Sequence, residues 1–597
     1  MLTLLSVFLQ AQENYKIRKI NFHGNKAIEE SDLQDVMAAK EVSWLQQLVN
    51  KKEPSLYNQD LMNMDLERIL QVYHQEGYMN AKDSLVVQRI NENRQSVKLA
   101  IYIAEGHPYR VDSLTFSFPK LSPLNEDSLA AALRHKLVLH KGKRFRDVAL
   151  NNDVSLIQNA FRNRGYAYAT ADYVLHLNPG KLKVTIHYSV TPGPLCKFGE
   201  ISIRGNKHTT AASIKKQLTI HTGKIYNRHQ LDRSRENLYH LQLFRIVSVN
   251  PQKDPKTLQN PIPVRLLIKE APQVTTRLGV GYGTEDKIRA YVDMDLLGIF
   301  NTTSRLNLYI KHSDLVPYSV SIKWTQPNFP GINSTLAVNP FLERNSEPGY
   351  ETRTYGVNVP FTYQVNRWLT SSLTFYRQDV KQKAEAEDAD IPGREDEDFL
   401  YNKSGIILKT VINTSTPTFD PNRGINISTG LKINGYAFGT DFSYTRLWAD
   451  LRKYQSLGSC VLAFRLMGGG INSADESQYI PVEDRYYAGG SNSVRGWSRS
   501  MLGPLRSNGK PLGGKSILEG NMELRFPLVW KVSGVTFLDF GNVWQPSYSY
   551  HLNELAYAAG GGLRVDTPIG PIRFDVGMPV WNTKKTPQFF ISVGQAF

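Results

Sequence analysis

The residues of this chain that are best suited to specific chemistry lie in one stretch, from Arg485 to Trp497. The stretch combines paired glycines, aromatic residues and two arginines inside residues 471–514, which show no clear helix or strand pattern. A segment of about 40 residues without secondary structure is usually functional or disordered, and disordered segments are rarely this rich in Tyr, Gly and Trp. We therefore expect a folded loop in which Arg495 reaches a carboxylate inside a closed β-structure. The alternative is a turn whose glycines only provide positive φ angles.

The sequence offers no set of residues typical of an enzyme. Histidines such as His23 and His208 lack the spacing of metal ligands, and no Ser/His/Asp or Cys/His set stands out. The two cysteines, Cys196 and Cys460, lie too far apart to suggest a disulfide framework or a zinc site. The acidic run from Glu385 to Asp398 suits a solvated extracellular loop better than a cation site. We expect neither catalysis nor a cofactor or metal.

Composition restricts the class of protein. A chain of 597 residues is too long for one core and predicts several domains. With 11% aromatic and 21% charged residues and a mean hydropathy of −0.37, the chain is not disordered. No run approaches the roughly 18 apolar residues of a membrane-spanning helix, but a transmembrane β-barrel alternates apolar and polar residues and keeps mean hydropathy low. The net charge of +16 is spread along the chain, so we expect a solvated surface, facing anionic lipid, rather than a nucleic-acid-binding surface.

The chain begins with a short apolar run, residues 2–9, followed by Gln-Ala-Gln. The run is similar to the hydrophobic part of a secretory signal, although it is short and has no basic segment before it. We interpret residues 1–12 as the remnant of a signal sequence; a buried strand is the alternative.

The first half of the chain repeats one layout with a period of roughly 90 residues, over residues 13–107, 108–194 and 195–272. Each segment opens with an alternating strand, continues with two helical patterns and closes with an alternating hairpin. Two of the second helices end at Gly77 and Gly165, as expected for glycine caps. The layout predicts three compact βααββ modules.

This layout resembles the POTRA module, which is known for binding in the periplasm by strand addition. The sheet of such a module has an edge at which an extended partner gains main-chain hydrogen bonds. The alternative is that the repeats act only as spacers.

The second half of the chain, residues 273–597, contains about sixteen alternating segments of about 8 to 12 residues, separated by turn residues. An even number of such strands is what a closed membrane barrel requires, and closure removes exposed strand edges. A large soluble β-sandwich is the alternative, but the aromatic residues near strand ends favour interfacial girdles. The sequence therefore predicts α+β modules followed by an all-β transmembrane barrel.

The two ends of this barrel have distinctive sequences. Glycines occupy alternate positions of the first strand, Gly279, Gly281 and Gly283, and remove side chains that would hold a seam with the last strand. The last strand contains Gly594 and ends in Phe597, and an aromatic final residue resembles the insertion signal of outer-membrane barrels. We expect the first and last strands to pair weakly.

Asp539 lies between two apolar residues of an alternating strand and must face the opposite side, into the lumen if they face lipid. Arg495 is a suitable partner because a guanidinium pairs with a carboxylate in a two-pronged geometry that lysine cannot reproduce. Gly496 would let the loop backbone approach the wall, and Glu523 on the preceding strand is a second acceptor.

Two motifs resemble those of the BamA/TamA family of outer-membrane protein assembly factors. The sequence from Val494 to Trp497 is similar to the Val-Arg-Gly-aromatic loop motif of the family, with Trp497 in place of the usual Phe or Tyr. Residues 537–541 are similar to its Phe-x-Asp-x-Gly strand motif. With the POTRA-like repeats, the resemblance covers nearly the whole chain. It implies that the loop folds into the lumen and that Arg495 pairs with Asp539.

The resemblance also implies a function in a bacterial outer membrane, with the modules in the periplasm and outer-membrane lipid around the barrel. Client outer-membrane or secreted proteins would be inserted or exported at the weak seam by β-augmentation. Three modules favour the TamA-like branch, in which the expected partner is a TamB-like protein anchored in the inner membrane. The alternatives are a pore that exports one dedicated secreted substrate and a passive porin-like channel with adhesive repeats.

Overall fold

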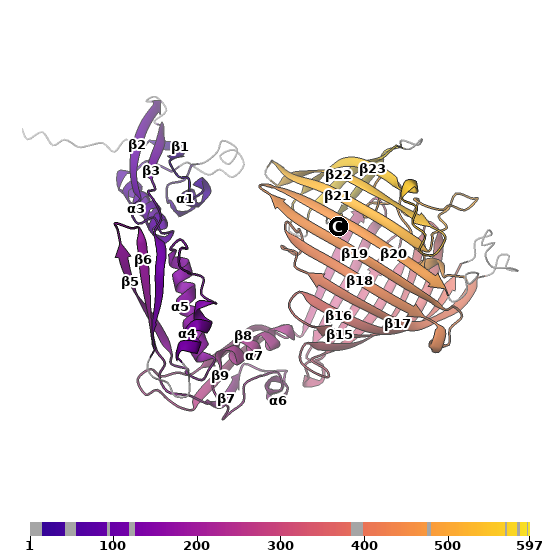
Figure 1. Cartoon of the computed structure of the whole chain (residues 1–597). Coiled ribbons are helices and arrows are strands. Elements are labelled where there is room, and N and C mark those ends of the chain that lie inside the picture. Colours follow the sequence, from indigo (N-terminus) through magenta and orange to yellow (C-terminus); the bar gives the residue numbers. More distant parts are fainter. Residues whose placement is uncertain are drawn as a thin grey trace, which may run out of the picture. The chain divides into compact units, whose positions relative to one another are not determined.

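The computed structural model describes residues 15–41, 55–91, 96–118, 126–383, 398–473, 479–529, 531–567, 570–581, 586–593 and 595–596. The expected signal sequence, nearly all of the acidic run, Gly594 and Phe597 lie outside the described residues. The chain divides into two compact units, and the residues of the third module are divided between them. Figure 1 shows the helix-containing modules and the barrel.

The three modules repeat the predicted strand–helix–helix–strand–strand order, so this part of the predicted fold is confirmed (Figure 1). In each sheet the last strand of the module lies between the other two. In the first two modules this central strand is parallel to the opening strand and antiparallel to its hairpin partner. The elements are β1 (Lys16–His23), α1 (Glu30–Val36), α3 (Gln59–Gln75), β2 (Lys82–Asn91) and β3 (Ser96–Ala104); β4 (Arg110–Ser117), α4 (Glu126–Arg134), α5 (Asp147–Arg162), β5 (Thr170–Asn178) and β6 (Lys183–Thr191); β7 (Phe198–Arg204), α6 (Ala211–Lys215), α7 (Arg228–His240), β8 (Phe244–Pro251) and β9 (Ile262–Glu270).

The second module shows why these sequences fold. Helix α5 buries Leu150, Ile157 and Phe161, which recur at helical spacing and share one face. Strand β6 buries alternate residues from Val184 to Val190, which share one face of the sheet. Burying each large apolar side chain contributes about 1.5–3 kcal/mol, so this interface holds the module together.

A buried carboxylate also supports each of the first two modules. Asp65 in α3 and Asp153 in α5 are both 0% exposed. Asp65 accepts hydrogen bonds from the backbone N–H groups of residues 38 and 39, at 2.8 and 2.9 Å. Asp153 accepts the equivalent bonds from residues 138 and 139, at 2.6 and 3.1 Å. Each carboxylate satisfies buried backbone donors and ties the second helix to the turn after the first; the sequence analysis missed both.

The second half forms a 16-stranded sheet in which every strand is antiparallel to its neighbours in the chain, so the predicted barrel architecture is confirmed (Figure 1). The strands are β10 (Val274–Gly283), β11 (Lys287–Leu297), β12 (Arg305–His312), β13 (Tyr318–Pro327), β14 (Ser334–Glu347), β15 (Tyr350–Gln364), β16 (Leu369–Gln382), β17 (Phe399–Asn413), β18 (Gly424–Asn434), β19 (Tyr444–Leu457), β20 (Cys460–Ser473), β21 (Ser516–Val529), β22 (Val532–Trp544), β23 (Ala556–Val565), β24 (Ile572–Val580) and β25 (Gln588–Val593).

Residues alternate between the two faces of the barrel wall. Glu523 and Asp539 are fully buried on the inner face, whereas Leu538, the residue before Asp539, belongs to the outer face. Other outer-face residues are large, apolar and well exposed, such as Leu400 at 69% and Leu447 at 48%. An outward apolar band of this kind is typical of a barrel in lipid. Among the described residues, no helix is both long and apolar enough to cross a membrane.

One half-buried lysine gives the modules a group whose protonation is coupled to folding. The ammonium of Lys253 donates a hydrogen bond to the backbone oxygen of Ala167 and lies 5.4 Å from the centre of the Tyr226 ring. Burial, and then the positive charges of Arg162 and Arg228, lower the pKa of Lys253 from 10.5 to about 8. The folded protein therefore binds this proton less tightly than the unfolded chain does.

We expect this lysine to make stability depend on pH. Between about pH 8 and 10.5 the unfolded state binds more protons at Lys253, so its contribution to stability rises with pH. Lys253→Met should stabilise the modules at neutral pH and flatten this rise. The measurement is the melting temperature of the full-length protein against pH, followed by helical circular dichroism. The exposed Lys256→Met is the control, and equal pH profiles for the two variants would contradict the account.

Candidate functional site in the barrel lumen

The segment between β20 and β21 is a folded loop, which we call the lumen loop and which is described over residues 479–515. Isolated bridges join Tyr486 to Gly514 and Ala488 to Leu502. Val494 is 0% exposed and packs in a cluster that includes residues of the loop and of strands β19 to β23. The loop therefore packs against the inner face of the barrel wall, and the alternative of a simple turn does not apply.

Arg495 is the most enclosed charged group of this loop, at 0% exposed. Its Nε and Nη2 donate to the two carboxylate oxygens of Asp539, at 2.7 and 2.8 Å, and its backbone N–H donates to the same carboxylate at 3.1 Å. Its Nη1 donates to Glu523 at 2.5 Å. The guanidinium carbon also lies 3.5 Å from the centre of the Phe537 ring. The structure thus brings together the three charged residues singled out from the sequence.

Further charged residues complete this cluster. Asp575 on β24 lies 3.5 Å from Arg495 and is also bonded to Arg564 on β23. Arg525 on β21 donates two hydrogen bonds to Glu523, at 2.9 and 3.0 Å. Each carboxylate in the cluster therefore faces at least one guanidinium. Such balance is required because an unpaired buried charge is strongly unfavourable.

Glycines allow the loop to lie directly on the wall. A Cβ atom on Gly496 would lie 2.8 Å from the Cβ of Ala558 and 3.0 Å from the backbone nitrogen of Pro579. A Cβ atom on Gly577 of β24 would lie 2.3 Å from the backbone oxygen of Arg495. Trp497 closes a local turn, since its N–H donates to the oxygen of Val494 at 3.2 Å. The structure thus gives Gly496 the close approach that we expected.

A second cluster, of reversed polarity, holds the beginning of the lumen loop. Here the loop contributes the carboxylates and the wall the cations. The ammonium of Lys403 on β17 donates to Glu483 at 2.6 Å and to Asp484 at 2.9 Å. Asp484 also accepts from Lys432 on β18 and from the Tyr444 hydroxyl on β19, both at 2.5 Å. The loop is therefore held by charge to two separate groups of strands.

The lumen loop also contacts both ends of the barrel sheet. The N–H of Ser491 donates to Glu285, just after β10, at 3.0 Å. The hydroxyl of Ser498 donates to Gln588, the first residue of β25, at 2.8 Å. Arg499 adds an ion pair with Glu347 at the end of β14, at 2.8 Å. The segment around Arg495 therefore spans the gap between the first and last strands.

The seam itself is weakly bonded. In the described part of the chain, β10 and β25 are the two ends of the sheet and share no ladder. The N–H of Thr284 donates to the oxygen of Ile591 at 3.1 Å, and the N–H of Ile591 donates to the Thr284 hydroxyl at 3.3 Å. Within the described residues, strand β25 has six residues, compared with ten in β10. A short last strand limits the number of hydrogen bonds that can close the barrel.

The seam glycines have an additional role that we did not predict. A Cβ atom on Gly279 would lie 2.1 Å from the Tyr291 ring of β11, and one on Gly281 would lie 2.9 Å from the Arg289 side chain. A Cβ atom on Gly283 would lie 2.4 Å from Asp286 and 3.5 Å from the oxygen of Ile591. The first two glycines therefore make room for side chains of β11 that cover β10.

Sequence reasoning missed several members of the site. Asp575 carried a usable signal, because its Asp-x-Gly sequence from Asp575 to Gly577 repeats that of Asp539 to Gly541. Lys403 and Lys432 carried no such signal, since their partner Asp484 lies in a loop far along the chain.

Comparison with known proteins is consistent with this architecture. Residues 299–597 match the family model described as "Omp85 superfamily domain". Residues 15–106, 126–193 and 196–271 match the model described as "Surface antigen variable number repeat", the POTRA repeat.

Similar curated proteins include two named "Outer membrane protein assembly factor BamA". The protein from Nitratidesulfovibrio vulgaris is 22% identical, over 99% of this chain and 75% of its own length. The protein from Neisseria meningitidis serogroup B is also 22% identical, over 98% of this chain and 78% of its own length. Among solved structures, BamA from Haemophilus ducreyi lacking POTRA domains 1–3 superposes with a TM-score of 0.64 at 19% identity. That match covers 82% of this chain and all of the solved chain, and it shows that the fold is shared.

The second charge cluster gives a prediction. Asp484→Ala should strongly reduce the amount of folded barrel, because it leaves the buried Lys432 without its carboxylate and breaking a buried pair costs about 3–5 kcal/mol. The double variant Asp484→Leu with Lys432→Met should recover much of the loss, because both charges are removed together and the Lys403–Glu483 pair is kept. The measurement is the folded fraction, from the heat-dependent gel shift of the barrel. A double variant that folds no better than Asp484→Ala would contradict the prediction.

Proposed function

The chain belongs to the Omp85 superfamily, and we propose that it assists the insertion of client β-barrel proteins into the bacterial outer membrane at the seam between β10 and β25. The barrel lies in the outer membrane and the POTRA modules in the periplasm. The name assembly factor, carried by the similar proteins, supports insertion rather than catalysis as the activity.

The observation that carries this proposal is that, in the described residues, β10 and β25 share no ladder of backbone hydrogen bonds. An exposed strand edge presents a row of unpaired N–H and C=O groups, and unpaired backbone groups are costly in lipid. Strand β10 has ten residues and is paired with β11 along its length, so the backbone groups of every second residue point to this gap. In the described residues Thr284 and Ile591 supply the seam bonds. A client strand that pairs with β10 would satisfy these backbone groups by β-augmentation. The free energy of client folding would then drive insertion without a nucleotide.

The lumen loop gives this seam a defined closed state. Ser491 and Ser498 contact residues on the two sides of the seam, and Arg495 fixes the segment between them to the wall. We propose that Arg495, Gly496, Asp539 and Glu523 hold the loop in this position. A passive channel is disfavoured, because such a channel would need neither these ion pairs nor a weak seam.

The expected partners follow from the same proposal. Client outer-membrane proteins are the substrates, and secreted proteins are a second class of client that the same opening would serve. The TamA-like assignment and a TamB-like partner stay predictions that rest on three modules, and the similar proteins reported above carry the BamA name.

Locking the seam tests the proposal. In a background with Cys196→Ser and Cys460→Ser, the pair Thr284→Cys and Ile591→Cys places thiols at the two residues that meet across the seam. A short bifunctional thiol crosslinker should then block client assembly in cells depleted of the native protein. The measurement is the amount of folded client protein in the outer membrane. Normal client levels with a fully crosslinked seam would contradict lateral insertion.

A matched control uses the pair Phe574→Cys and Ile591→Cys, which face each other in the β24–β25 ladder. Crosslinking these strands joins two that are already paired, so client assembly should continue. Loss of clients in both pairs would indicate damage to β25 rather than closure of the seam.

A further inference from the structure

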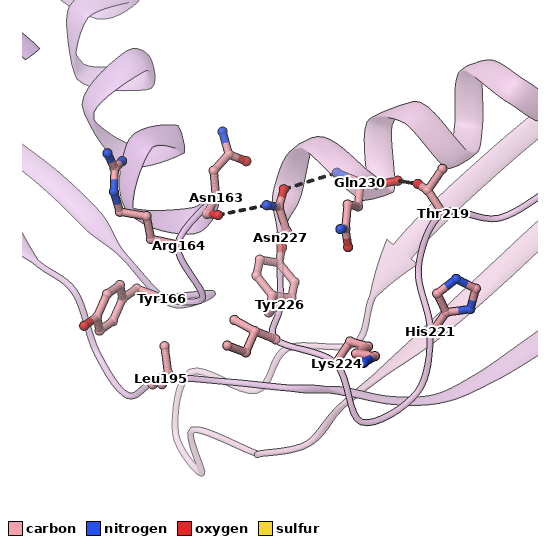
Figure 2. Close-up of a pocket in the computed structure, with 11 residues that line it drawn as sticks. Asn163, Arg164, Tyr166, Leu195, Thr219, His221, Lys224, Tyr226, Asn227 and Gln230 are labelled. Carbon is pink, nitrogen blue, oxygen red and sulfur yellow. Dashed lines mark hydrogen bonds between the residues drawn. The ribbon is translucent and has the colours of Figure 1, made fainter. Parts of the chain in front are cut away.

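The joint between the second and third modules contains a hollow of about 900 Å³ (Figure 2). Ligand sites are typically about 300–1,000 Å³, so it is large enough for several side chains. Its wall is mostly apolar, and it includes Leu195 and Ile225, which are 53% and 54% exposed. Figure 2 shows Arg164 and Leu195 on one side of the hollow and Lys224 on the other.

The hollow is preformed by hydrogen bonds between the two modules and within the third module. The N–H of Cys196 donates to the oxygen of Gly165, and the N–H of Tyr226 donates to the oxygen of Cys196, both at 2.9 Å. The side-chain amide of Asn227 donates to the backbone oxygen of Asn163 at 2.9 Å (Figure 2). A rigid concave surface of this kind loses little entropy when a partner binds.

The first two modules are joined in the same way, which provides an internal comparison. There the N–H of Tyr109 donates to the oxygen of Gly77 at 2.8 Å, and the N–H of Phe145 donates to the oxygen of Tyr109 at 2.9 Å. By this equivalence, Gly77 corresponds to Gly165 and Phe145 to Tyr226. The preceding residues correspond as well, Glu76 to Arg164 and Arg144 to Ile225.

The two joints differ at those corresponding residues. In the first joint, Glu76 forms ion pairs with Arg144 and with Arg146, the second at 2.8 Å. In the second joint an arginine replaces the acidic residue and isoleucine replaces its partner, so the ion pair is missing and the apolar surface is open. The position that holds a carboxylate in one joint therefore holds a cation in the other.

The second joint also carries uncompensated positive charge. In the described part of the chain, neither Arg164 nor Lys224 forms an ion pair, and no acidic residue is among those that line the hollow. The lowered pKa of nearby Lys253, caused first by burial and then by Arg162 and Arg228, is consistent with an excess of positive charge at this joint. A carboxylate brought by a partner would supply what Glu76 supplies in the first joint.

We propose that this hollow is a docking site for an acidic segment of a separate accessory protein, with a large apolar side chain between its carboxylates. The apolar side chain covers Leu195 and Ile225, and the carboxylates pair with Arg164 and Lys224. The partner binds a groove between modules rather than a sheet edge, so this contact is distinct from strand addition and from the seam.

Peptide binding to the full-length protein in detergent tests the proposal. The probe is a fluorescent peptide with leucine and phenylalanine flanked by glutamates, and the comparison peptide has lysines in place of the glutamates. We expect the acidic peptide to bind at least about tenfold more tightly, equivalent to about 1.4 kcal/mol. Equal affinity of the two peptides would overturn the proposal.

Two variants show whether the hollow is the site. The double variant Arg164→Glu with Ile225→Arg transfers the ion pair of the first joint and should close the hollow, lowering affinity for the acidic peptide about tenfold. Leu195→Ser, a milder change at an exposed side chain, should weaken binding severalfold. Lys181→Glu, an exposed charge change outside the residues lining the hollow, is the control and should leave affinity unchanged. Wild-type affinity in both Arg164→Glu/Ile225→Arg and Leu195→Ser would overturn the assignment.

Peptide affinity is measured without clients, so this result is independent of the seam experiment. A peptide that binds the hollow while a locked seam still permits insertion would support docking and contradict lateral insertion.

Discussion

The pairing of the buried Arg495 guanidinium with carboxylates of the barrel wall is the interaction on which the rest of the barrel interior depends. A guanidinium at 0% exposure is stable only if carboxylates meet it, since the effective desolvation penalty in proteins is several kcal/mol per ion. Glu523, Asp539 and Asp575 come from three different strands, so the strand register and the loop conformation must form together. A shift of one residue in any of these strands would turn its carboxylate toward lipid.

The consequence is a loop that connects distant parts of the barrel. At Arg495 the loop supplies the cation and the wall the carboxylates, whereas at Asp484 the polarity is reversed. Reversed polarity disfavours a loop position in which Arg495 and Asp484 exchange their places on the wall. In that position Arg495 would face cations and Asp484 would face carboxylates. On either side of Arg495, at Ser491 and Ser498, the loop contacts residues on both sides of the seam. The weak part of the sheet is therefore closed by the loop as well as by its own hydrogen bonds.

Local sequence patterns predicted the elements, whereas the partners of charged residues required the fold. Alternation identified the sixteen strands and the inward direction of Asp539, because a strand places every second side chain on one face. The pairing of Asp484 with Lys403 and Lys432 could not be predicted, because it depends on where a long loop settles in three dimensions. The glycines of β10 also show how far prediction from the sequence reaches. Their missing side chains were visible in the sequence, but the Tyr291 ring that occupies the space beside Gly279 was not.

The most direct test of this account is a double-mutant cycle between the loop and the wall. The folded fraction of the barrel in the outer membrane would be measured for Arg495→Glu, Asp539→Arg and the double variant. The account predicts that each single change removes most of the folded barrel and that the double variant recovers part of it, because the buried charges are paired again. Normal folding of both single variants, or a double variant no better than the worse single one, would contradict the central role of the Arg495–Asp539 ion pair.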